Sequence, residues 1–225
     1  MEDGKAMNKL NILYEDNHII VVEKRPNILS QSDITKDKDL LTMVKEYVKE
    51  KYNKPGNVYI GLVHRLDRPV GGIMVFARTS KAASRLSEQI KNHKFKKTYL
   101  AIVEGIIEKD EDVLEDKLLK LNDGNTVISD NGKTSILEYK VIDRNYKANK
   151  TLVKINLKTG RHHQIRVQFA NQGYPLAGDQ RYGKADNKQI ALYAYKLEFI
   201  HPTTKEHLEF SKLPEKKDYW TLFTL

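Results

Sequence analysis

The chain has 225 residues, of which 40% are hydrophobic, so it is long enough to bury a substantial core. It contains no cysteine, which excludes disulfides, thiolate catalysis and cysteine-based zinc sites and favours a reducing, cytoplasmic location. Lys and Arg number 39 against 30 Asp and Glu. The resulting formal net charge of +9 makes a nucleic acid a candidate partner, although a basic surface can also serve solubility alone.

The first part of the chain predicts two strands followed by a helix. Apolar residues at 12–14 and 19–22 flank a polar turn, which is typical of a strand pair. The apolar residues of 40–48 recur at helical spacing after Asp39, a residue type that favours helix N-caps. No apolar run in the chain approaches the roughly 20 residues that a membrane-spanning helix needs, so we expect no membrane partner.

The middle of the chain predicts a strand, a helix and a second strand. Residues 72–79 are almost continuously apolar, as in a buried strand, and residues 80–94 have helical periodicity. Residues 97–105 alternate like a strand that ends at a glycine. The charged segment 107–132 shows no clear period, so we expect an irregular excursion between core strands there.

The last part of the chain predicts a hairpin, a short helix and two further strands. Residues 134–143 and 151–158 flank a polar turn and suggest the hairpin. The helix is expected over 161–173, where it ends at a glycine. Residues 191–202 and 206–213 have the composition of strands.

Together these elements predict an α+β fold with a mixed, mostly antiparallel central sheet and flanking helices, because most of the strands are linked by hairpins. We expect a single domain over residues 10–225 and a flexible N-terminus over residues 1–9, which lack the apolar core of a signal peptide. Nothing in the sequence demands more than a monomer.

The stretch GLVHRLDRPVGG, residues 61–72, places Asp67 between Arg65 and Arg68 at a bend after an apolar run. The Pro-Val-Gly-Gly bend lets the backbone turn sharply and lets a ligand or another segment approach closely. A carboxylate here could do chemistry beside a negatively charged partner. It could also cap the turn or pair with a neighbouring arginine, which is the commoner case for an aspartate in such a loop.

The stretch TGRHHQIR, residues 159–166, gathers two arginines, two histidines and a glutamine. On a helix that begins near His162, Arg166 would lie one turn further along on the same side. Such donors suit phosphates or a buried carboxylate, but a solvated basic helix end fits the residues equally well. Residues 91–97, KNHKFKK, are likewise either a phosphate-contact surface or a solubilising patch.

Metal and nucleophile chemistry are poorly supported. His64, Asp67, His162 and His163 are of metal-ligand types, yet the chain has no compact H-E-x-x-H motif, and adjacent histidines do not easily face one site. We therefore expect no metal, and a metal-dependent hydrolase is the weakest of the functions considered. The chain also lacks a G-x-S-x-G nucleophile elbow and a phosphate-binding G-x-x-x-x-G-K-[ST] loop.

Four stretches in order resemble the RluA-type pseudouridine synthases: HRLDRPVGG, KTYLAIVEG, TGRHHQIRVQFANQGYPLAGDQRYG and ALYAYKLEFIHP. The resemblance runs from about residue 12 to the C-terminus, and the combination of HRLD, GRxHQIR and GDxRYG is highly specific. It implies the pseudouridine synthase fold. It also implies an enzyme that isomerises selected uridines in ribosomal or transfer RNA to pseudouridine, without cofactor or metal.

The resemblance implies three catalytic residues. Asp67 matches the catalytic aspartate that acts at the ribose, either by attacking the sugar or by removing a ribose proton, and both roles stay open. Tyr99 matches the tyrosine that stacks on the uracil and takes part in proton transfer at C5. Arg166 matches the arginine that pairs with the aspartate. An ordinary aspartate is already ionised at pH 7, so this arginine would mainly orient the carboxylate.

The resemblance also implies contacts with RNA. By their position in the sequence beside Asp67, Arg65 and Leu66 are well placed to fill the gap that the target base leaves when it is flipped out of the stack. Leu197 matches an apolar residue near the base, although the strand pattern alone would make it a core residue. The other candidate RNA-binding residues are His64, Arg161, His163 and Gln164.

Three features depart from the family pattern. Residues 70–72 read Val-Gly-Gly where relatives usually carry Thr-Ser-Gly, and His162 and Gln168 stand where relatives often carry Thr and His. The resemblance begins near residue 10, so we expect no counterpart of the small S4-like RNA-binding module that many relatives carry. We expect these departures to affect loop geometry and RNA preference more than catalysis. The rival interpretation, a non-catalytic RNA-binding protein, is disfavoured by the retained aspartate, tyrosine and arginine.

Overall fold

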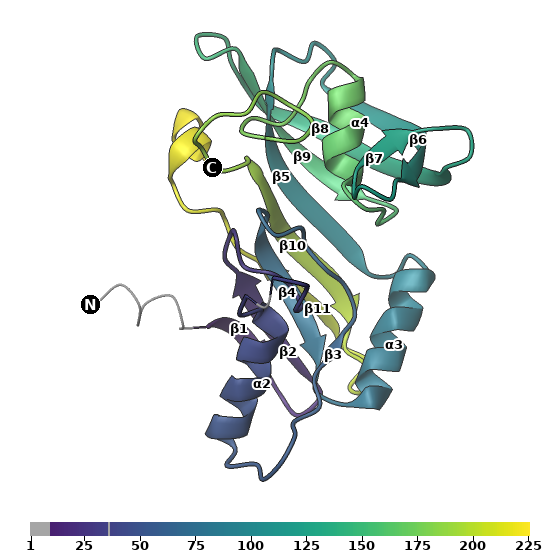
Figure 1. Cartoon of the computed structure of the whole chain (residues 1–225), viewed down its shortest axis with the longest axis vertical. Coiled ribbons are helices and arrows are strands. Elements are labelled where there is room, and N and C mark those ends of the chain that lie inside the picture. Colours follow the sequence, from purple (N-terminus) through teal and green to yellow (C-terminus); the bar gives the residue numbers. More distant parts are fainter. Residues whose placement is uncertain (1–9, 36) are drawn as a thin grey trace. The chain divides into compact units, whose positions relative to one another are not determined.

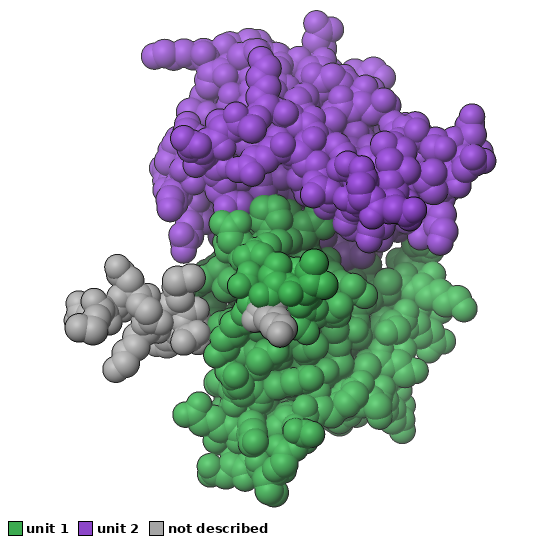
Figure 2. Space-filling model, viewed as in Figure 1, with its two compact units in different colours: residues 1–95, 197–212 green, residues 96–196, 213–225 purple. Residues whose placement is uncertain are grey.

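The computed structural model describes residues 10–35 and 37–225, which divide into two compact units. Unit 1 comprises residues 1–95 and 197–212, and unit 2 comprises residues 96–196 and 213–225 (Figure 2). Residues 1–9, predicted to be flexible, lie outside the described residues. The single domain predicted for residues 10–225 stays a prediction.

Unit 1 is built on a sheet that combines strands from both ends of the sequence (Figure 1). Its strands hydrogen-bond in the order β1-β2-β4-β10, with β3 on β4 and β11 on β10. The pairs β1–β2, β2–β4 and β3–β4 are antiparallel, which confirms the predicted N-terminal strand pair. The bounds are β1 Asn11–Glu15, β2 Ile19–Lys24, β3 Gly61–Leu62, β4 Gly71–Ala77, β10 Leu192–Ile200 and β11 His207–Ser211.

Two helices accompany this sheet, α2 over Leu40–Lys51 and α3 over Ser80–Lys91. The side chain of Asp39 accepts a hydrogen bond from the backbone N–H of Thr42 at 3.0 Å, so the predicted N-cap is confirmed. Thr79 caps α3 in the same way. Neither these helices nor any other helix of the described residues is both long and apolar enough to cross a membrane.

The core of unit 1 packs α3 against one face of the sheet. Its buried members are Ile19, Val21, Ile73, Val75, Ala77, Ala82, Leu86, Phe95, Leu197 and Phe199. Residues that point to the other face of β2 and β4, such as Ile20 and Phe76, are fully buried as well. These two strands are therefore covered on both faces, which explains why they read as continuous apolar runs in the sequence.

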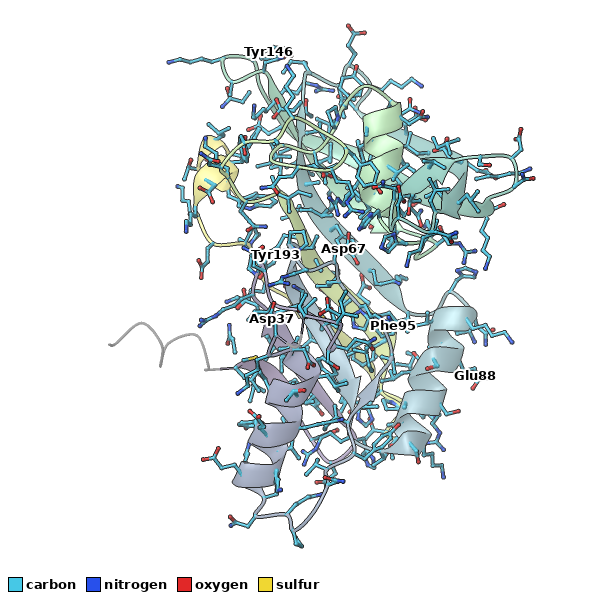
Figure 3. All side chains as sticks on the ribbon, viewed as in Figure 1. Asp37, Asp67, Glu88, Phe95, Tyr146 and Tyr193 are labelled. Atoms are coloured by element: carbon cyan, nitrogen blue, oxygen red, sulfur yellow. The ribbon has the colours of Figure 1, made fainter. Side chains whose placement is uncertain are left out.

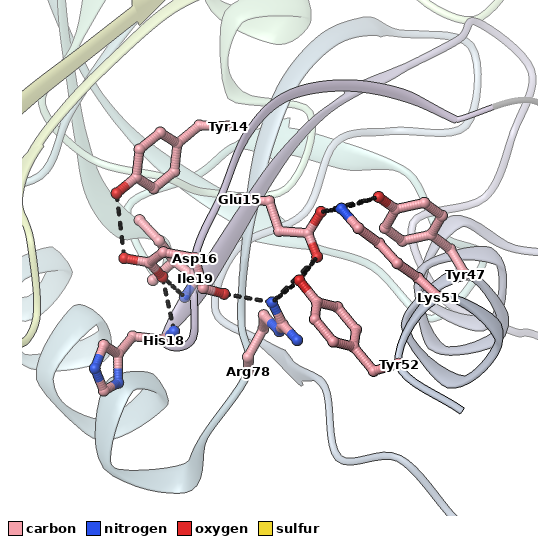
Figure 4. Close-up of polar contacts among 9 residues, drawn as sticks. All are labelled: Tyr14, Glu15, Asp16, His18, Ile19, Tyr47, Lys51, Tyr52 and Arg78. Atoms are coloured by element: carbon pink, nitrogen blue, oxygen red, sulfur yellow. Dashed lines mark hydrogen bonds and ion pairs between the residues drawn. The ribbon is translucent and has the colours of Figure 1, made fainter. Parts of the chain in front are cut away.

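A polar network joins β1 to α2 and to the end of β4 (Figure 4). The carboxylate of Glu15 accepts hydrogen bonds from Tyr47 at 2.9 Å, Lys51 at 2.7 Å and Tyr52 at 2.8 Å. Arg78 donates to the same carboxylate at 3.1 Å. Burial by itself raises the pKa of Glu15, but the hydrogen bonds from Lys51, Tyr52 and Tyr47 outweigh it and hold the pKa below its ordinary value. An ionised Glu15 thus fixes the first strand of the unit.

Unit 2 consists of a mostly antiparallel sheet together with a short helix and the C-terminal segment of the chain. Its strands hydrogen-bond in the order β10-β5-β9-β8-β6-β7, and β10 passes from this unit into unit 1 at residue 197. The pairs β5–β9, β8–β9, β6–β8 and β6–β7 are antiparallel. The bounds are β5 Lys96–Glu104, β6 Glu111–Lys120, β7 Thr126–Ile128, β8 Lys133–Asn145, β9 Lys150–Leu157, α4 Gln164–Asn171 and a 3₁₀ helix Asp218–Leu222.

The C-terminal segment completes the core of unit 2. Tyr219, Trp220 and Phe223 are buried there. They pack with residues of β5, β9 and β10 and of the loop before β10, namely Leu100, Ile102, Leu152, Ala177, Ala191 and Tyr193. The sequence pattern did not predict this 3₁₀ segment.

The prediction of an irregular excursion over residues 107–132 is wrong. β6 pairs with β8 from Glu111 to Leu118, and it forms a hairpin with β7. Only Leu114 and Leu118 are buried among the ten residues of β6. The strand is therefore held by backbone pairing while half of its residues are exposed, so its apolar pattern is too sparse to reveal it.

The predicted fold class is confirmed. The structure is α+β, with a mostly antiparallel sheet and helices that flank it rather than alternate with every strand (Figure 1).

Candidate active site

Asp67 lies in the loop between β3 and β4 of unit 1 (Figure 3), and the backbone on its C-terminal side is firmly held. The N–H of Val70 donates to the carbonyl of Asp67 at 3.0 Å and closes a turn. The carbonyl of Arg68 accepts two hydrogen bonds, from the backbone N–H of Asn27 at 2.8 Å and from the ammonium of Lys24 at 2.9 Å. Two peptide groups after Asp67 are thus fixed by specific partners.

Lys24 is an unusual hydrogen-bond donor to this loop because its side chain is completely buried. Its Nζ donates to the carbonyl of Ile28 at 2.6 Å as well as to Arg68. Burial lowers the pKa of Lys24 to about 7, and the negative charge of Asp67 opposes that shift. The loop that carries Asp67 therefore rests on an amine that titrates near neutral pH.

The buried amine makes folding stability depend on pH. An unfolded lysine has a pKa of about 10.4, so between about pH 7 and pH 10 the unfolded chain holds a proton that folded Lys24 does not. The free energy of unfolding that depends on Lys24 is therefore highest above this pH window and decreases as the pH falls to about 7. We expect the free energy of unfolding of wild type, relative to Lys24→Met, to fall with decreasing pH by at most about 1.4 kcal/mol per pH unit, measured by urea unfolding.

The matched control for that measurement is Lys45→Met, which removes an exposed lysine of α2 in the same unit. An equal pH slope for Lys24→Met and Lys45→Met would contradict the expectation, since the slope would then not come from burial of an amine.

The three residues before Asp67 differ in their surroundings. Nε2 of His64 accepts a hydrogen bond from the backbone N–H of Val75 at 3.1 Å, which ties the loop to β4. Leu66 is buried, with 8% of its surface exposed, whereas Arg65 is exposed. Their predicted contacts with RNA stay predictions, and Arg65 is the member of the three with the most accessible side chain.

Tyr99 lies in β5 of unit 2, buried to 7% exposure and paired in register with Ile155. Side chains two apart share a face of a strand, so Lys97 points to the same side as Tyr99. The ammonium of Lys97 lies over Gly160, since a Cβ added to that glycine would come within 3.1 Å of Nζ. Burial lowers the pKa of Lys97. A partly desolvated lysine on the Tyr99 face of β5 therefore lies against the TGRHHQIR stretch.

Arg166 lies on α4 and makes a buried, two-pronged ion pair with Asp179. Its Nε donates to Oδ2 at 2.8 Å and its Nη2 donates to Oδ1 at 2.7 Å. Asp179 is fully buried and also accepts from the backbone N–H groups of Arg181 and Tyr182. Burial by itself raises the pKa of Asp179, but Arg166 and these N–H groups outweigh it and hold the pKa below its ordinary value. The pair fixes the orientation of the guanidinium.

The start of α4 is built by its own polar side chains. The helix begins at Gln164 rather than near His162, because His163 has a left-handed backbone with φ of 52°. The side-chain oxygen of Gln164 accepts from the hydroxyl of Thr159 at 2.8 Å and from the backbone N–H of Arg161 at 3.1 Å. Gln164 is therefore buried as a brace of this turn, while Arg161 is exposed.

His163 is a neutral hydrogen-bonding partner in this turn. Its Nδ1 lies 2.8 Å from the hydroxyl of Tyr182, which also accepts from the backbone N–H of Thr126 at 2.9 Å. Burial and then the charge of Arg166 lower the pKa of His163 to about 3. The hydroxyl of Tyr182, in the loop after α4, thus links the GRHHQIR turn to β7 through hydrogen bonds.

Four residues that hold the candidate residues in place were not predicted from the sequence: Lys24, Ser30, whose hydroxyl hydrogen-bonds both backbone groups of Leu66, Asp179 and Tyr182. The last two lie in the GDQRYG stretch, which was recognised as a motif without a role for its members. Leu197, predicted to contact the base, is 1% exposed and belongs to the core of unit 1. Asp67 belongs to unit 1, and Tyr99 and Arg166 to unit 2, so the pairing of Asp67 with Arg166 stays a prediction.

Among the described residues, no group of three or more His, Asp or Glu side chains is arranged to hold a metal ion. An aspartate on a fixed loop, a buried tyrosine, and an arginine locked by an ion pair are suited to acid–base or nucleophilic chemistry.

Comparisons with known proteins give a consistent result. A sequence model of a family described as RNA pseudouridylate synthase matches residues 18–171. An uncharacterized RNA pseudouridine synthase of Aquifex aeolicus is 33% identical over 89% of this chain and 68% of its own length. Ribosomal large subunit pseudouridine synthase C of Haemophilus influenzae is 32% identical over 92% of this chain and 68% of its own length. The chain thus spans about two thirds of the length of these two relatives.

The fold has also been seen in solved structures. The structure of human RNA pseudouridylate synthase domain containing 4 superposes with a TM-score of 0.77, at 20% sequence identity, over 94% of this chain and 90% of that one. This likeness concerns the fold, and it agrees with the α+β architecture described above.

Proposed function

Because the chain belongs to the RNA pseudouridylate synthase family, we propose that it converts specific uridines of ribosomal or transfer RNA to pseudouridine, with Asp67 as the catalytic aspartate. Membership of this family makes the chain an isomerase that acts on RNA. The observation that carries the proposal is that the family match over residues 18–171 includes Asp67, Tyr99 and Arg166.

Ribosomal RNA is the substrate that we favour. The relative from Haemophilus influenzae, which aligns with 92% of this chain, is named for the large ribosomal subunit. Transfer RNA is the second candidate, as the resemblance to the RluA type implies. Either substrate fits the cytoplasmic location expected from the absence of cysteine.

The proposed reaction breaks the bond between uracil N1 and ribose C1′ and forms a bond between C5 and C1′. A proton leaves C5 and N1 gains one, so atoms and electrons balance without an oxidant or reductant. This balance supports the proposal that the reaction needs no cofactor. The target base must leave the stack before the reaction, at a cost of a few kcal/mol.

Asp67 would act at the ribose as the base detaches, and both a nucleophilic and a basic role require its ionised carboxylate. Tyr99 would stack on the uracil and take part in the proton transfer at C5. Arg166 would orient the carboxylate of Asp67. Its bidentate bonds to Asp179 support that role, because they hold the guanidinium in one orientation.

The proposal is tested by mapping pseudouridine in total RNA from cells with and without the gene, and in unmodified ribosomal and transfer RNA transcripts treated with the purified protein. We expect new pseudouridine at a small number of positions, which would also identify the substrate. A protein that bound RNA and left every position unmodified would contradict the proposed activity.

RNA binding should depend strongly on salt, because phosphates are neutralised by lysines and arginines. For single-stranded RNA the slope of log affinity against log salt is about −0.7 per neutralised phosphate. We expect Lys97→Met to make this slope shallower by about 0.7, since Lys97 is a partly desolvated cation on the Tyr99 face of β5. Filter binding at several salt concentrations measures the slope.

The control for this experiment is Lys154→Met, which removes an exposed lysine of β9 in the same unit. If Lys97→Met and Lys154→Met change the slope equally, Lys97 contributes only general charge, and the specific phosphate contact is wrong.

A further inference from the structure

Ser30 makes a reciprocal pair of hydrogen bonds with the residue immediately before Asp67. Its hydroxyl donates to the carbonyl of Leu66 at 2.8 Å and accepts from the backbone N–H of Leu66 at 3.1 Å. Ser30 is buried, with 5% of its surface exposed, and its hydroxyl also lies 3.7 Å from the sulfur of Met74 on β4. One hydroxyl thus satisfies both backbone groups of a buried residue.

The position of these bonds along the backbone matters. The carbonyl of Leu66 belongs to the peptide that enters Asp67, whereas the carbonyls of Asp67 and Arg68 belong to the two peptides that follow. Those two are held by Val70 and by Lys24 with Asn27, as described above. The hydroxyl of Ser30 binds the carbonyl of the entering peptide, so the α-carbon of Asp67 is fixed from its N-terminal side by this hydroxyl.

We propose that Ser30 is a positioning residue for Asp67, which acts by fixing the peptide that precedes the catalytic carboxylate. This inference rests on the proposed function, because it takes Asp67 as the catalytic aspartate. Without the hydroxyl, the backbone dihedrals between Leu66 and Asp67 lose their specific restraint while the downstream anchors stay in place. The carboxylate then samples several directions, and misplacement by about 1 Å can cost about 100-fold in rate.

A positioning role predicts a change in the chemical step and not in RNA binding. We expect Ser30→Ala to lower the single-turnover rate of pseudouridine formation about 10- to 100-fold on a transcript of the mapped site. The RNA dissociation constant should be unchanged, since the side chain is buried and carries no charge. Ser30→Thr keeps the hydroxyl and is expected to restore most of the rate.

The matched control is Thr151→Val in unit 2. The hydroxyl of Thr151 donates to the carbonyl of Gly105 at 2.8 Å and accepts from the backbone N–H of Ile107 at 3.0 Å, which is the same kind of buried bridge. None of these residues is a candidate site residue. Thr151→Val should lower the urea midpoint, as Ser30→Ala does, and leave the single-turnover rate at the wild-type value.

Amide hydrogen exchange gives a second measurement that does not depend on activity. Ser30→Ala is expected to accelerate exchange of the Leu66 amide, and Thr151→Val is expected to leave it unchanged. If Ser30→Ala does not fold, Ser30→Cys replaces it, because a thiol is a weak donor of similar size. The same rate and exchange readings then apply.

A wild-type rate in Ser30→Ala would overturn the proposal, and so would an equal loss of rate in Thr151→Val. If the wild-type protein modified no RNA at all, the proposed function would fail by itself. Unchanged exchange of the Leu66 amide in Ser30→Ala would then show separately that Ser30 does not hold the loop.

Discussion

Asp67→Asn is expected to lower the rate of pseudouridine formation on the order of 10²–10⁴-fold or more, the range by which positioned acid–base groups contribute. Asparagine has nearly the same shape but cannot be ionised, so it can neither attack the ribose nor remove a proton from it. The loop should keep its conformation, because its hydrogen bonds run through the backbone carbonyls of residues 66–68. RNA affinity should therefore stay close to the wild-type value.

Asp37→Asn is the matched control for that experiment. Asp37 is an exposed aspartate of unit 1 (Figure 3). It forms an ion pair at 2.7 Å with Arg68, the residue that follows Asp67 in the sequence. An exposed pair of this kind contributes little, so Asp37→Asn should turn over normally. Single-turnover assays with tritium-labelled RNA measure both variants. Turnover of Asp67→Asn at the rate of Asp37→Asn would show that Asp67 is not the catalytic aspartate.

Asp179→Ala is expected to lower the free energy of unfolding by about 3–5 kcal/mol. The substitution leaves the guanidinium of Arg166, whose side chain is 7% exposed, without its bidentate partner. It also removes the acceptor of two backbone N–H groups. Urea unfolding followed by fluorescence suits this test, because the single tryptophan, Trp220, is buried in the core of the same unit.

Asp110→Ala provides the comparison in unit 2. Asp110 pairs with Arg144 at 2.6 Å, but its side chain is 80% exposed, so its loss should cost about 1 kcal/mol or less. Equal effects of Asp179→Ala and Asp110→Ala would contradict the importance of burial. The double variant Arg166→Met with Asp179→Leu should regain part of the lost stability, since it removes both charges together, while it should not regain activity.

The same pair sets a pH dependence at the acidic end. The pKa of Asp179 is lowered in the folded protein, so its stabilising contribution is complete above the ordinary aspartate pKa of about 3.9 and is lost as the pH falls through the lower, folded value. Acid unfolding of the wild type should accordingly be steeper in this range than that of the double variant.

The spacing of apolar residues in the sequence predicted those helices and strands in which the apolar side chains are the buried ones. The strand over residues 72–79 reads as an apolar run because β4 is covered on both faces, and Asp39 was recognised as an N-cap from its residue type alone. β6 was not predicted, because a strand with two buried residues out of ten shows no clear alternation of apolar and polar residues. Its place in the sheet is decided by its partner β8, which lies later in the sequence.

The motif residues of the candidate site could be predicted from the sequence, whereas the residues that hold them in place could not. Asp67, Tyr99 and Arg166 stand in stretches that resemble a known family, so their positions could be named in advance. Asp179 lies 13 residues after Arg166, and Ser30 lies 36 residues before Leu66, and no local pattern links such pairs. Their partnership exists only after the chain has folded.

The interleaving of the two units has a consequence for protein synthesis. Leu197 and Phe199 complete the core of unit 1, yet the ribosome makes them only after it has made all of residues 96–196. The emerging chain must therefore keep the apolar faces of β4 and α3 uncovered while unit 2 is being translated. A nascent chain stalled before residue 197 should remain sensitive to protease within the unit 1 residues up to residue 95 and should recruit chaperones that bind exposed apolar surface.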